Sequence, residues 1–112
     1  MSWEVMYLPE AEKDYRALSH NRQLMVDKAI RRVKENPLPR DEGGYGQPLG
    51  HRQGANLTGY LKVKLRGEGL RIVYRLLRTN TQMLVVVIGV REDAEVYEIA
   101  RRRIERRGGE NR

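Results

Sequence analysis

The sequence predicts an α+β fold, in which a mainly antiparallel four-stranded sheet carries an N-terminal helical hairpin on one face and a short C-terminal helix. Three observations predict this class. The chain of 112 residues is long enough for one hydrophobic core and too short for two. Helix-like periodicity occurs near both ends of the chain, and most of the strand-like segments lie between these helical regions. We therefore treat residues 1–112 as a single domain.

The N-terminal third predicts a strand followed by two helices. Residues 3–8 alternate well enough for a short strand, and Pro9 suits the first position of a helix. Ser19 suits a cap before the second helix, which should end at Asn36 because proline disfavours helical geometry in the residue before it. The apolar stripes of the two helices are Ala11, Tyr15 and Leu18, then Val26, Ala29, Ile30 and Val33. Two short helices in succession form a hairpin that can cover one side of a sheet.

The rest of the chain predicts a long loop, three strands and a closing helix. Residues 37–59 show no helical or strand period and contain six glycines, which predicts an irregular connection. The strand candidates are 60–66, 70–77 and 83–90, and the last is apolar at almost every position, as expected of a strand buried on both faces. The apolar stripe of the closing helix is Val96, Ile99, Ala100 and Ile104, and we expect a frayed tail over about 107–112.

Charge and composition narrow the candidate partners. Lys and Arg number 22 against 15 Asp and Glu, which gives a formal net charge of +7 and a pI near 10.0. This balance favours nucleic acid or an acidic protein as a partner. The sequence contains no cysteine, which excludes a disulfide framework and a thiolate zinc site. The N-terminus lacks a secretory-leader pattern and no apolar run approaches the roughly 18 residues that span a bilayer, so we expect a cytoplasmic protein with no membrane partner.

Strand parity gathers positive charge on one face of the predicted hairpin. In the segment YLKVKLRGEGLRIVYRLL (60–77), side chains alternate between the two faces of the sheet. The apolar side chains face the helices, and the cationic side chains share the other face. These cations are Lys62, Lys64, Arg66, Arg71 and Arg75. The same alternation groups Arg91 with Gly89, Val87 and Val85, so Arg91 should emerge beside them.

A sheet with this pattern is expected to bind an anion, because like charges opposite one another across strands are destabilising. Taken singly, each lysine or arginine is better explained as ordinary surface charge, or as a guard against edge-to-edge aggregation. The grouping of the cations on one face favours the anion site.

Two segments, YLKVKLRGEGLRIVYRL and VVVIGVREDAEVY, resemble the RelE/ParE superfamily of bacterial toxins from type II toxin–antitoxin pairs, and within it the RelE-like ribosome-dependent mRNA endonucleases. The order of elements is similar over nearly the whole chain. The resemblance implies a catalytic set, with Arg71 binding phosphate, that consists of Lys62, Lys64, Arg71, Arg91 and Tyr97. It implies no metal and no cofactor. Gyrase-directed ParE-like relatives share the fold and generally lack this set.

The sequence departs from the family pattern at two positions. Leu70 stands where an aromatic residue commonly precedes the turn arginine, and Val90 stands where the founding type has a lysine. Other branches of the family use a Glu and His acid–base pair. The two histidines of this chain, His20 and His51, fall in no catalytic spacing.

The residue types also suit RNA cleavage on chemical grounds. RNA carries its own nucleophile, the 2′-hydroxyl, so an enzyme must remove its proton, stabilise the charged phosphorane and protonate the departing 5′-oxygen. Lys64 is our candidate proton acceptor with Lys62 in support, since crowding among like charges favours the neutral form of a lysine. Arg71 would bind the scissile phosphate, and Arg91 would stabilise charge or donate a proton. Tyr97 would orient the 2′-hydroxyl, stack on a base or pack the last helix.

The expected function is therefore that of a toxin that cleaves mRNA in the ribosomal A site. Arg66 and Arg75 would add contacts to the RNA. By the resemblance, the partners are the ribosome, mRNA and a cognate antitoxin, with operator DNA reached only through the antitoxin complex. Three alternatives stay open: a ParE-like gyrase inhibitor, a non-catalytic RNA-binding domain, and an inactive toxin that keeps only antitoxin and operator binding.

Overall fold

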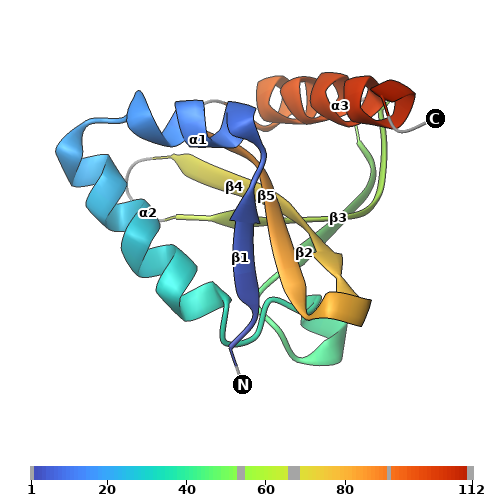
Figure 1. Ribbon diagram of the computed structural model, residues 1–112, viewed down its shortest axis with the longest axis horizontal. Helices are drawn as coiled ribbons and strands as arrows, with labels where there is room; N and C mark the ends of the chain where they lie inside the picture. The colour runs from blue at the N-terminus through green and yellow to red at the C-terminus, as the bar shows by residue number, and fades with distance from the viewer. Residues whose placement is uncertain (1, 53–54, 66–68, 91, 111–112) are drawn as a thin grey trace.

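The computed structural model describes residues 2–52, 55–65, 69–90 and 92–110, which form a five-stranded sheet with helices on both sides (Figure 1). The strands are β1 (Glu4–Tyr7), β2 (Gln47–Arg52), β3 (Ala55–Lys64), β4 (Leu70–Leu77) and β5 (Gln82–Val90). The helices are α1 (Pro9–Arg16), α2 (His20–Val33) and α3 (Asp93–Glu110), with 3-10 turns at Arg40–Glu42 and Arg78–Asn80. The strand order is β1-β5-β4-β3-β2, and only the β1–β5 pair is parallel among the described strands. The expected α+β class is confirmed.

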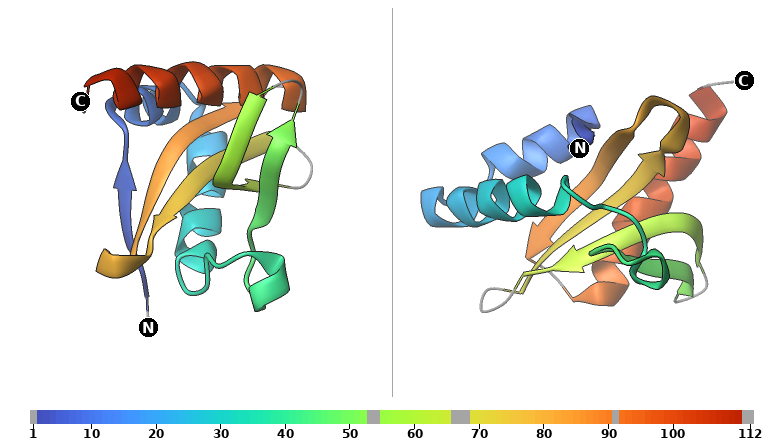
Figure 2. Two further views of the ribbon diagram at one scale, coloured as in Figure 1. Left: turned by 90° about the vertical axis from the view of Figure 1, so that its right-hand side faces the viewer. Right: turned by 90° about the horizontal axis from the view of Figure 1, so that it is seen from below.

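The helices cover opposite faces of the sheet (Figure 2). α1 and α2 pack on one face, which we call the hairpin face, through buried side chains such as Ala11 and Val26. α3 crosses the other face, where a Cβ placed on Gly89 of β5 would lie 3.8 Å from Val96. Ser19 caps α2 as expected, because its hydroxyl accepts the backbone N–H of the third helical residue at 3.3 Å. Apolar side chains are therefore buried on both sides of the sheet.

The segment 37–59 is not the irregular loop that its composition predicts. It contains a 3-10 turn, the whole of β2 and the start of β3, so the sheet has five strands rather than four. β2 lies at the edge of the sheet, where proline is tolerated because one side of the strand has no neighbour. Its register with β3 shifts between Pro48 and Gly50. A strand with such a shift has no clean two-residue period, which explains why the sequence pattern missed it.

Tyr74 of β4 anchors the connection that precedes β2. Its buried hydroxyl donates to the Pro37 carbonyl at 2.8 Å, and burial raises the pKa of this phenol. A Cβ on Gly46 would lie 2.4 Å from the Tyr74 Oη, so glycine is required for this close approach. An exposed ion pair at 2.8 Å joins Glu42 to Arg78. The connection is therefore closed onto the sheet by contacts with β4 and the turn after it.

An extra residue in β5 changes the expected alternation. Val73 pairs with Val87, whereas Tyr74 pairs with Val85, which leaves Val86 as a bulge. Val85 therefore shares the hairpin face with Tyr74, and the expectation that groups it with the cations is wrong. The middle of β5 is nevertheless buried on both faces, as expected.

Two side chains complete the edge of β5 beyond the short strand β1. The backbone N–H of Ile88 donates to Asp14 Oδ2 of α1 at 3.0 Å. The carbonyl of Val86 accepts from Arg103 Nη1 of α3 at 2.8 Å. Side chains from the first and last helices thus satisfy backbone groups that a longer β1 would otherwise pair.

The C-terminal helix is longer than expected. α3 has 18 residues and continues to Glu110, so part of the segment expected to fray is helical. Arg101 forms ion pairs with Glu98 and Glu105 along the helix, a spacing that supports helix formation. Within the described ranges, no helix is long and apolar enough to cross a membrane.

Candidate functional site

β3 and β4 place the predicted cations on the face of the sheet that α3 crosses. Directly opposite residues project to the same side, and three such pairs share this face: Lys64 with Arg71, Lys62 with Val73, and Tyr60 with Arg75. We call these six residues the basic face. Strand parity predicted this grouping for its four cations. Arg66 and Arg91, which the same parity assigned to it, lie outside the described residues.

Lys62 is not an exposed cation. α3 lies over it, and only 7% of its surface is exposed. Its ammonium nitrogen donates to Tyr97 Oη at 2.8 Å and lies 5.4 Å from the centroid of the same ring. Tyr97 is itself 3% exposed, so its ring packs α3 onto the sheet. The two residues form a buried positive charge with a hydroxyl partner beneath the helix.

Lys64 and Arg71 form the accessible end of the basic face. Lys64 is exposed at the end of β3, and Arg71 is half-buried near the start of β4. Arg71 Nη1 donates to the Gly69 carbonyl at 2.7 Å, which fixes one edge of the guanidinium beside the turn. Gly69 has a φ of 69°, a left-handed conformation that glycine adopts at little cost. A compact ammonium and a planar guanidinium are thus carried at paired positions of neighbouring strands, an arrangement suited to a phosphate group.

Sequence reasoning missed Tyr60. The guanidinium carbon of Arg75 lies 5.7 Å from the centroid of the Tyr60 ring. Arg75 is exposed and Tyr60 is half-buried. Tyr60 lies two residues before Lys62 on β3, so the same alternation of side chains places it on the basic face. The sequence therefore contained the pattern that identifies this tyrosine.

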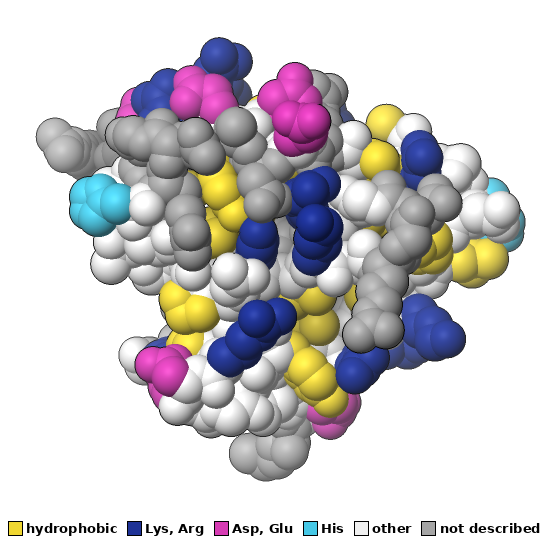
Figure 3. Space-filling model, turned by 180° about the vertical axis from the view of Figure 1, so that it is seen from behind, with side chains coloured by type: hydrophobic (Ala, Val, Ile, Leu, Met, Phe, Trp, Pro, Cys, Tyr) yellow, Lys and Arg dark blue, Asp and Glu magenta, His cyan; other side chains and the backbone are white. Residues whose placement is uncertain are grey.

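Lysine and arginine side chains gather along the middle of the side seen in Figure 3. Hydrophobic side chains lie among them, and the visible acidic side chains lie toward the periphery. A surface with this distribution attracts anions.

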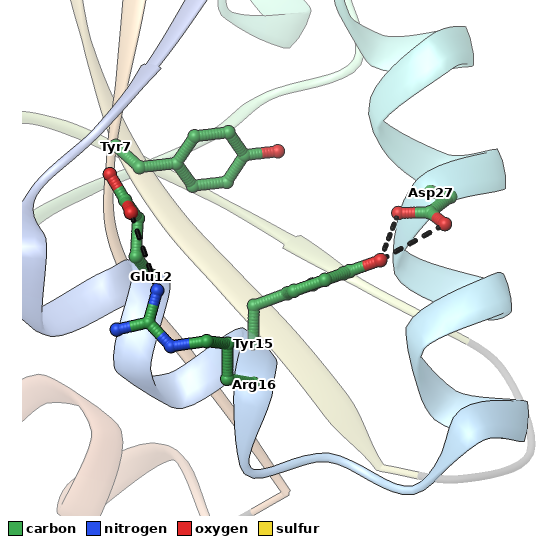
Figure 4. A pocket seen from close by; sticks show the side chains of 5 residues that line it. All are labelled: Tyr7, Glu12, Tyr15, Arg16 and Asp27. Atoms are coloured by element: carbon green, nitrogen blue, oxygen red, sulfur yellow. Dashed lines mark hydrogen bonds and ion pairs between the residues drawn. The ribbon is translucent and has the colours of Figure 1, made fainter.

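A groove of about 320 Å³ lies away from these cations, between β1, α1 and α2 (Figure 4). Tyr15 Oη donates to the Asp27 carboxylate at 2.8 Å, and this hydrogen bond raises the pKa of Tyr15. The pKa of Tyr7 is raised mainly by burial and, to a smaller extent, by the charge of Asp27. Glu12 and Arg16 form an ion pair at its rim. With two carboxylates in its lining, the groove is unsuited to phosphate.

The histidines lie on other elements than the basic face. His20 begins α2 and His51 lies on β2, and both are exposed. Among the described residues, no group of three or more His, Asp or Glu side chains is placed to hold a metal ion.

Comparison with known proteins gives related sequences. No protein-family model matches the chain. The mRNA interferase toxin RelE of Escherichia coli strain K12 is 28% identical over 104 residues, which cover 93% of this chain and 99% of RelE. A second Escherichia coli protein, named as a RelE-like toxin, is 28% identical over 107 residues, which cover 93% of this chain and 99% of that protein.

Solved structures of Escherichia coli RelE have the same fold. A RelE mutant in the free state matches with a TM-score of 0.70 at 26% identity, over 93% of this chain and 99% of that one. A RelE mutant in complex with a peptide of the antitoxin RelB matches with a TM-score of 0.65 at 25% identity, over 89% of this chain and 95% of that one. Sequence and fold therefore agree with RelE over nearly the whole length of this chain, which is similar to the RelE-like members of the RelE/ParE superfamily.

Proposed function

We propose that this protein is the toxin of a toxin–antitoxin pair and that it cleaves mRNA in the ribosomal A site without a metal ion. The observation that carries the proposal is Lys64 directly opposite Arg71 on the basic face. The chain is also similar along nearly its whole length to a protein named as an mRNA interferase. A lysine and an arginine in this arrangement suit the binding of a phosphate and the movement of a proton beside it.

The proposed reaction starts at the 2′-hydroxyl of the nucleotide before the cut. Lys64, in its neutral form, takes the hydroxyl proton while the 2′-oxygen bonds to the adjacent phosphorus. The bond from phosphorus to the 5′-oxygen of the next nucleotide then breaks, and that oxygen receives a proton. The products are a 2′,3′-cyclic phosphate and a 5′-hydroxyl. DNA lacks the nucleophile and is not cleaved by this route.

Arg71 is proposed to stabilise the phosphorane. Its planar guanidinium donates two parallel hydrogen bonds to two phosphate oxygens and stays charged throughout. The hydrogen bond to the Gly69 carbonyl orients the group before substrate arrives. A donor that is already oriented needs no reorganisation as negative charge develops.

Lys62 is proposed to supply a fixed positive charge from its buried position beneath α3, beside the phosphate site. It lies two residues from Lys64 along β3, or about 7 Å at the usual rise of a strand. The Tyr97 hydroxyl holds its ammonium group in place. Charge at this distance would stabilise the phosphorane, and we assign to Tyr97 the role of a positioning residue for Lys62.

The roles of Arg91 and Arg66 are proposed from the sequence, because both lie outside the described residues. Gly89 lies opposite Arg71, and Arg91 comes two residues after Gly89 in the sequence. We assign to it the second guanidinium, as a stabiliser or proton donor. Arg66 and Arg75 are assigned to RNA binding away from the cleaved bond.

The proposed partners follow from charge and from the relatives. A net charge of +7 suits docking onto ribosomal RNA, and action on translating ribosomes implies a cytoplasmic protein. One solved RelE is bound to a peptide of its antitoxin. For this chain we propose a cognate antitoxin with an acidic or amphipathic segment, through which operator DNA is reached.

Ribosomes programmed with a defined A-site codon test the proposal. The purified protein should cut the message and leave a cyclic phosphate, and Lys64→Ala should abolish most of this activity. Lys28→Ala is the matched control, because Lys28 is an exposed lysine on α2. Gyrase-linked DNA breaks with intact messages would instead establish the ParE-like alternative. RNA binding with neither outcome would establish a non-catalytic domain.

A further inference from the structure

A strip of four residues crosses the sheet beside the proposed phosphate site. The strand register places Met6, Leu84, Arg75 and Tyr60 side by side on β1, β5, β4 and β3. We call these residues the outer strip. They share a face with Lys62, yet α3 does not bury them: Met6 is 41% exposed, Arg75 is exposed, and the other two are half-buried. The outer strip is therefore open to a ligand that also reaches the basic face.

Arg75 is held by an aromatic ring rather than by a carboxylate. Its guanidinium carbon lies 5.7 Å from the Tyr60 ring centroid. In the part of the chain that the structure describes, Arg75 forms no ion pair, whereas Arg101 and Arg103 of α3 both pair with carboxylates. Among the described residues, no acid therefore neutralises the charge of Arg75 or covers the plane of its guanidinium.

The spacing along β3 indicates the chemistry of the ligand. Tyr60 lies two residues from Lys62 and four from Lys64, which corresponds to about 7 and 13 Å along the strand. A ligand that spans the longer distance meets the exposed Lys64 ammonium at one end and a ring with a guanidinium at the other. Single-stranded RNA offers both kinds of group, because its phosphates alternate with unpaired bases that stack on aromatic rings and guanidinium planes.

We propose that Tyr60 and Arg75 form a stacking platform for one unpaired base of the RNA, on the same face of the sheet as the cleavage site. This inference rests on the proposed function and adds a substrate contact to it. The Tyr60 ring supports the Arg75 guanidinium, and the base stacks on the surface that the pair presents. Because every base has an aromatic face, this contact holds the message without selecting one sequence.

A fluorescent base in the message tests the platform. The probe is a message with 2-aminopurine at one A-site position at a time, bound to ribosomes, with a 2′-deoxynucleotide at the cut so that the strand stays intact. The parental protein should quench the fluorescence at one position. Tyr60→Leu should abolish this quenching and weaken binding roughly 10- to 100-fold, the range typical of losing one stacked base. Tyr60→Phe keeps the ring and should behave as the parent.

Two further variants separate stacking from charge and from folding. Arg75→Lys keeps the charge but loses the plane, so it should weaken quenching. Tyr45→Leu is the matched control, because Tyr45 is 41% exposed and lies 5.1 Å from the guanidinium of Arg32, which belongs to α2. This control should leave quenching and affinity unchanged.

Several outcomes would overturn the platform. It is wrong if the parental protein quenches at no position, or if Tyr60→Leu quenches as the parent does. It is also wrong if Tyr60→Leu loses antitoxin binding alone, since the outer strip is then a protein-binding surface. The readout does not need cleavage, so the two proposals fail separately. Quenching by a protein that cuts no normal message contradicts only the cleavage, and cleavage that does not need Tyr60 contradicts only the platform.

Discussion

Arg103 of α3 and Asp14 of α1 form a two-point ion pair, with Nη1 2.7 Å from Oδ2 and Nη2 3.0 Å from Oδ1. Their side chains are only 15% and 19% exposed. Because each also bonds the backbone of β5, the pair joins the first helix, the last helix and the edge of the sheet. α3 carries Tyr97, so the same contact helps to hold the hydroxyl over Lys62.

Loss of this pair should destabilise the protein. Arg103→Ala leaves a largely buried carboxylate and a β5 carbonyl short of a donor, so the free energy of unfolding should fall by about 2–4 kcal/mol in urea denaturation. Arg102→Ala is the control, because Arg102 is 67% exposed and pairs with Glu98 at the surface. It should cost less than about 1 kcal/mol. Equal losses would mean that the buried pair contributes no more than a surface contact.

Tyr74→Phe should loosen the connection before β2. The substitution keeps the ring and leaves the buried Pro37 carbonyl without its hydroxyl donor, so unfolding should become easier by about 1–3 kcal/mol. Amide hydrogen exchange should accelerate over residues 37–46. Tyr15→Phe removes a hydroxyl from the open groove and should cost less. Unchanged exchange in Tyr74→Phe would show that Gly46 and its neighbours hold the connection unaided.

Acid should weaken the contact between α3 and α1 at Glu10. Arg107 Nη2 donates to Glu10 Oε1 at 2.8 Å, and this bond holds the pKa of the carboxyl below its usual value of 4.5. A carboxyl whose pKa is lower in the folded state stabilises the fold above the unfolded pKa, and this stability is lost as the pH falls through the folded pKa. The Tm of the parent should therefore drop more steeply than that of Glu10→Gln between about pH 5 and 3. If Tm falls with pH equally in the parent and in Glu10→Gln, the Glu10 carboxylate does not contribute to the acid sensitivity of the fold.

Tyr97→Phe tests how Lys62 is positioned. The variant keeps the packed ring and removes the oxygen that accepts from the Lys62 ammonium. Single-turnover cleavage on the ribosome should slow roughly tenfold, the rate equivalent of losing one such hydrogen bond. Message affinity should change little, because neither group is at the surface. A parental rate would show that Lys62 acts without this hydroxyl.

Removal of the proposed phosphate ligands should affect the rate rather than the fold. Arg71→Ala should slow cleavage by roughly 10²- to 10³-fold, the usual cost of one preorganised donor. Arg71→Lys should recover only part of this, since it keeps the charge and loses the planar fork. Arg91→Ala should behave as Arg71→Ala, with antitoxin binding retained. If Arg91→Ala cuts at the parental rate while Lys64→Ala does not, Arg91 is an ordinary surface residue.

The face of the sheet that carries the cations was predictable because β3 and β4 pair without a shift. From Tyr60 to Lys64, every residue keeps the alternation that the sequence displays. The sequence did not predict the strand β2, because its register shift between Pro48 and Gly50 breaks the two-residue period. It did not predict the bulge at Val86 either, because an extra residue leaves no mark in a strand that is apolar at almost every position. The burial of Lys62 was missed because parity gives the side of a sheet but not what covers it.

The parallel pairing of β1 with β5 sets the order in which the molecule can be assembled. Glu4 pairs with Gln82, so during synthesis the first strand waits for its neighbour until most of the chain has left the ribosome. Contacts between such distant segments carry a large loop-closure entropy and slow folding. Asp14 likewise meets Arg103 only when the last helix has been made. A nascent chain that stops short of α3 has neither the finished sheet edge nor the hydroxyl over Lys62, so the proposed site is among the last parts of the protein to form.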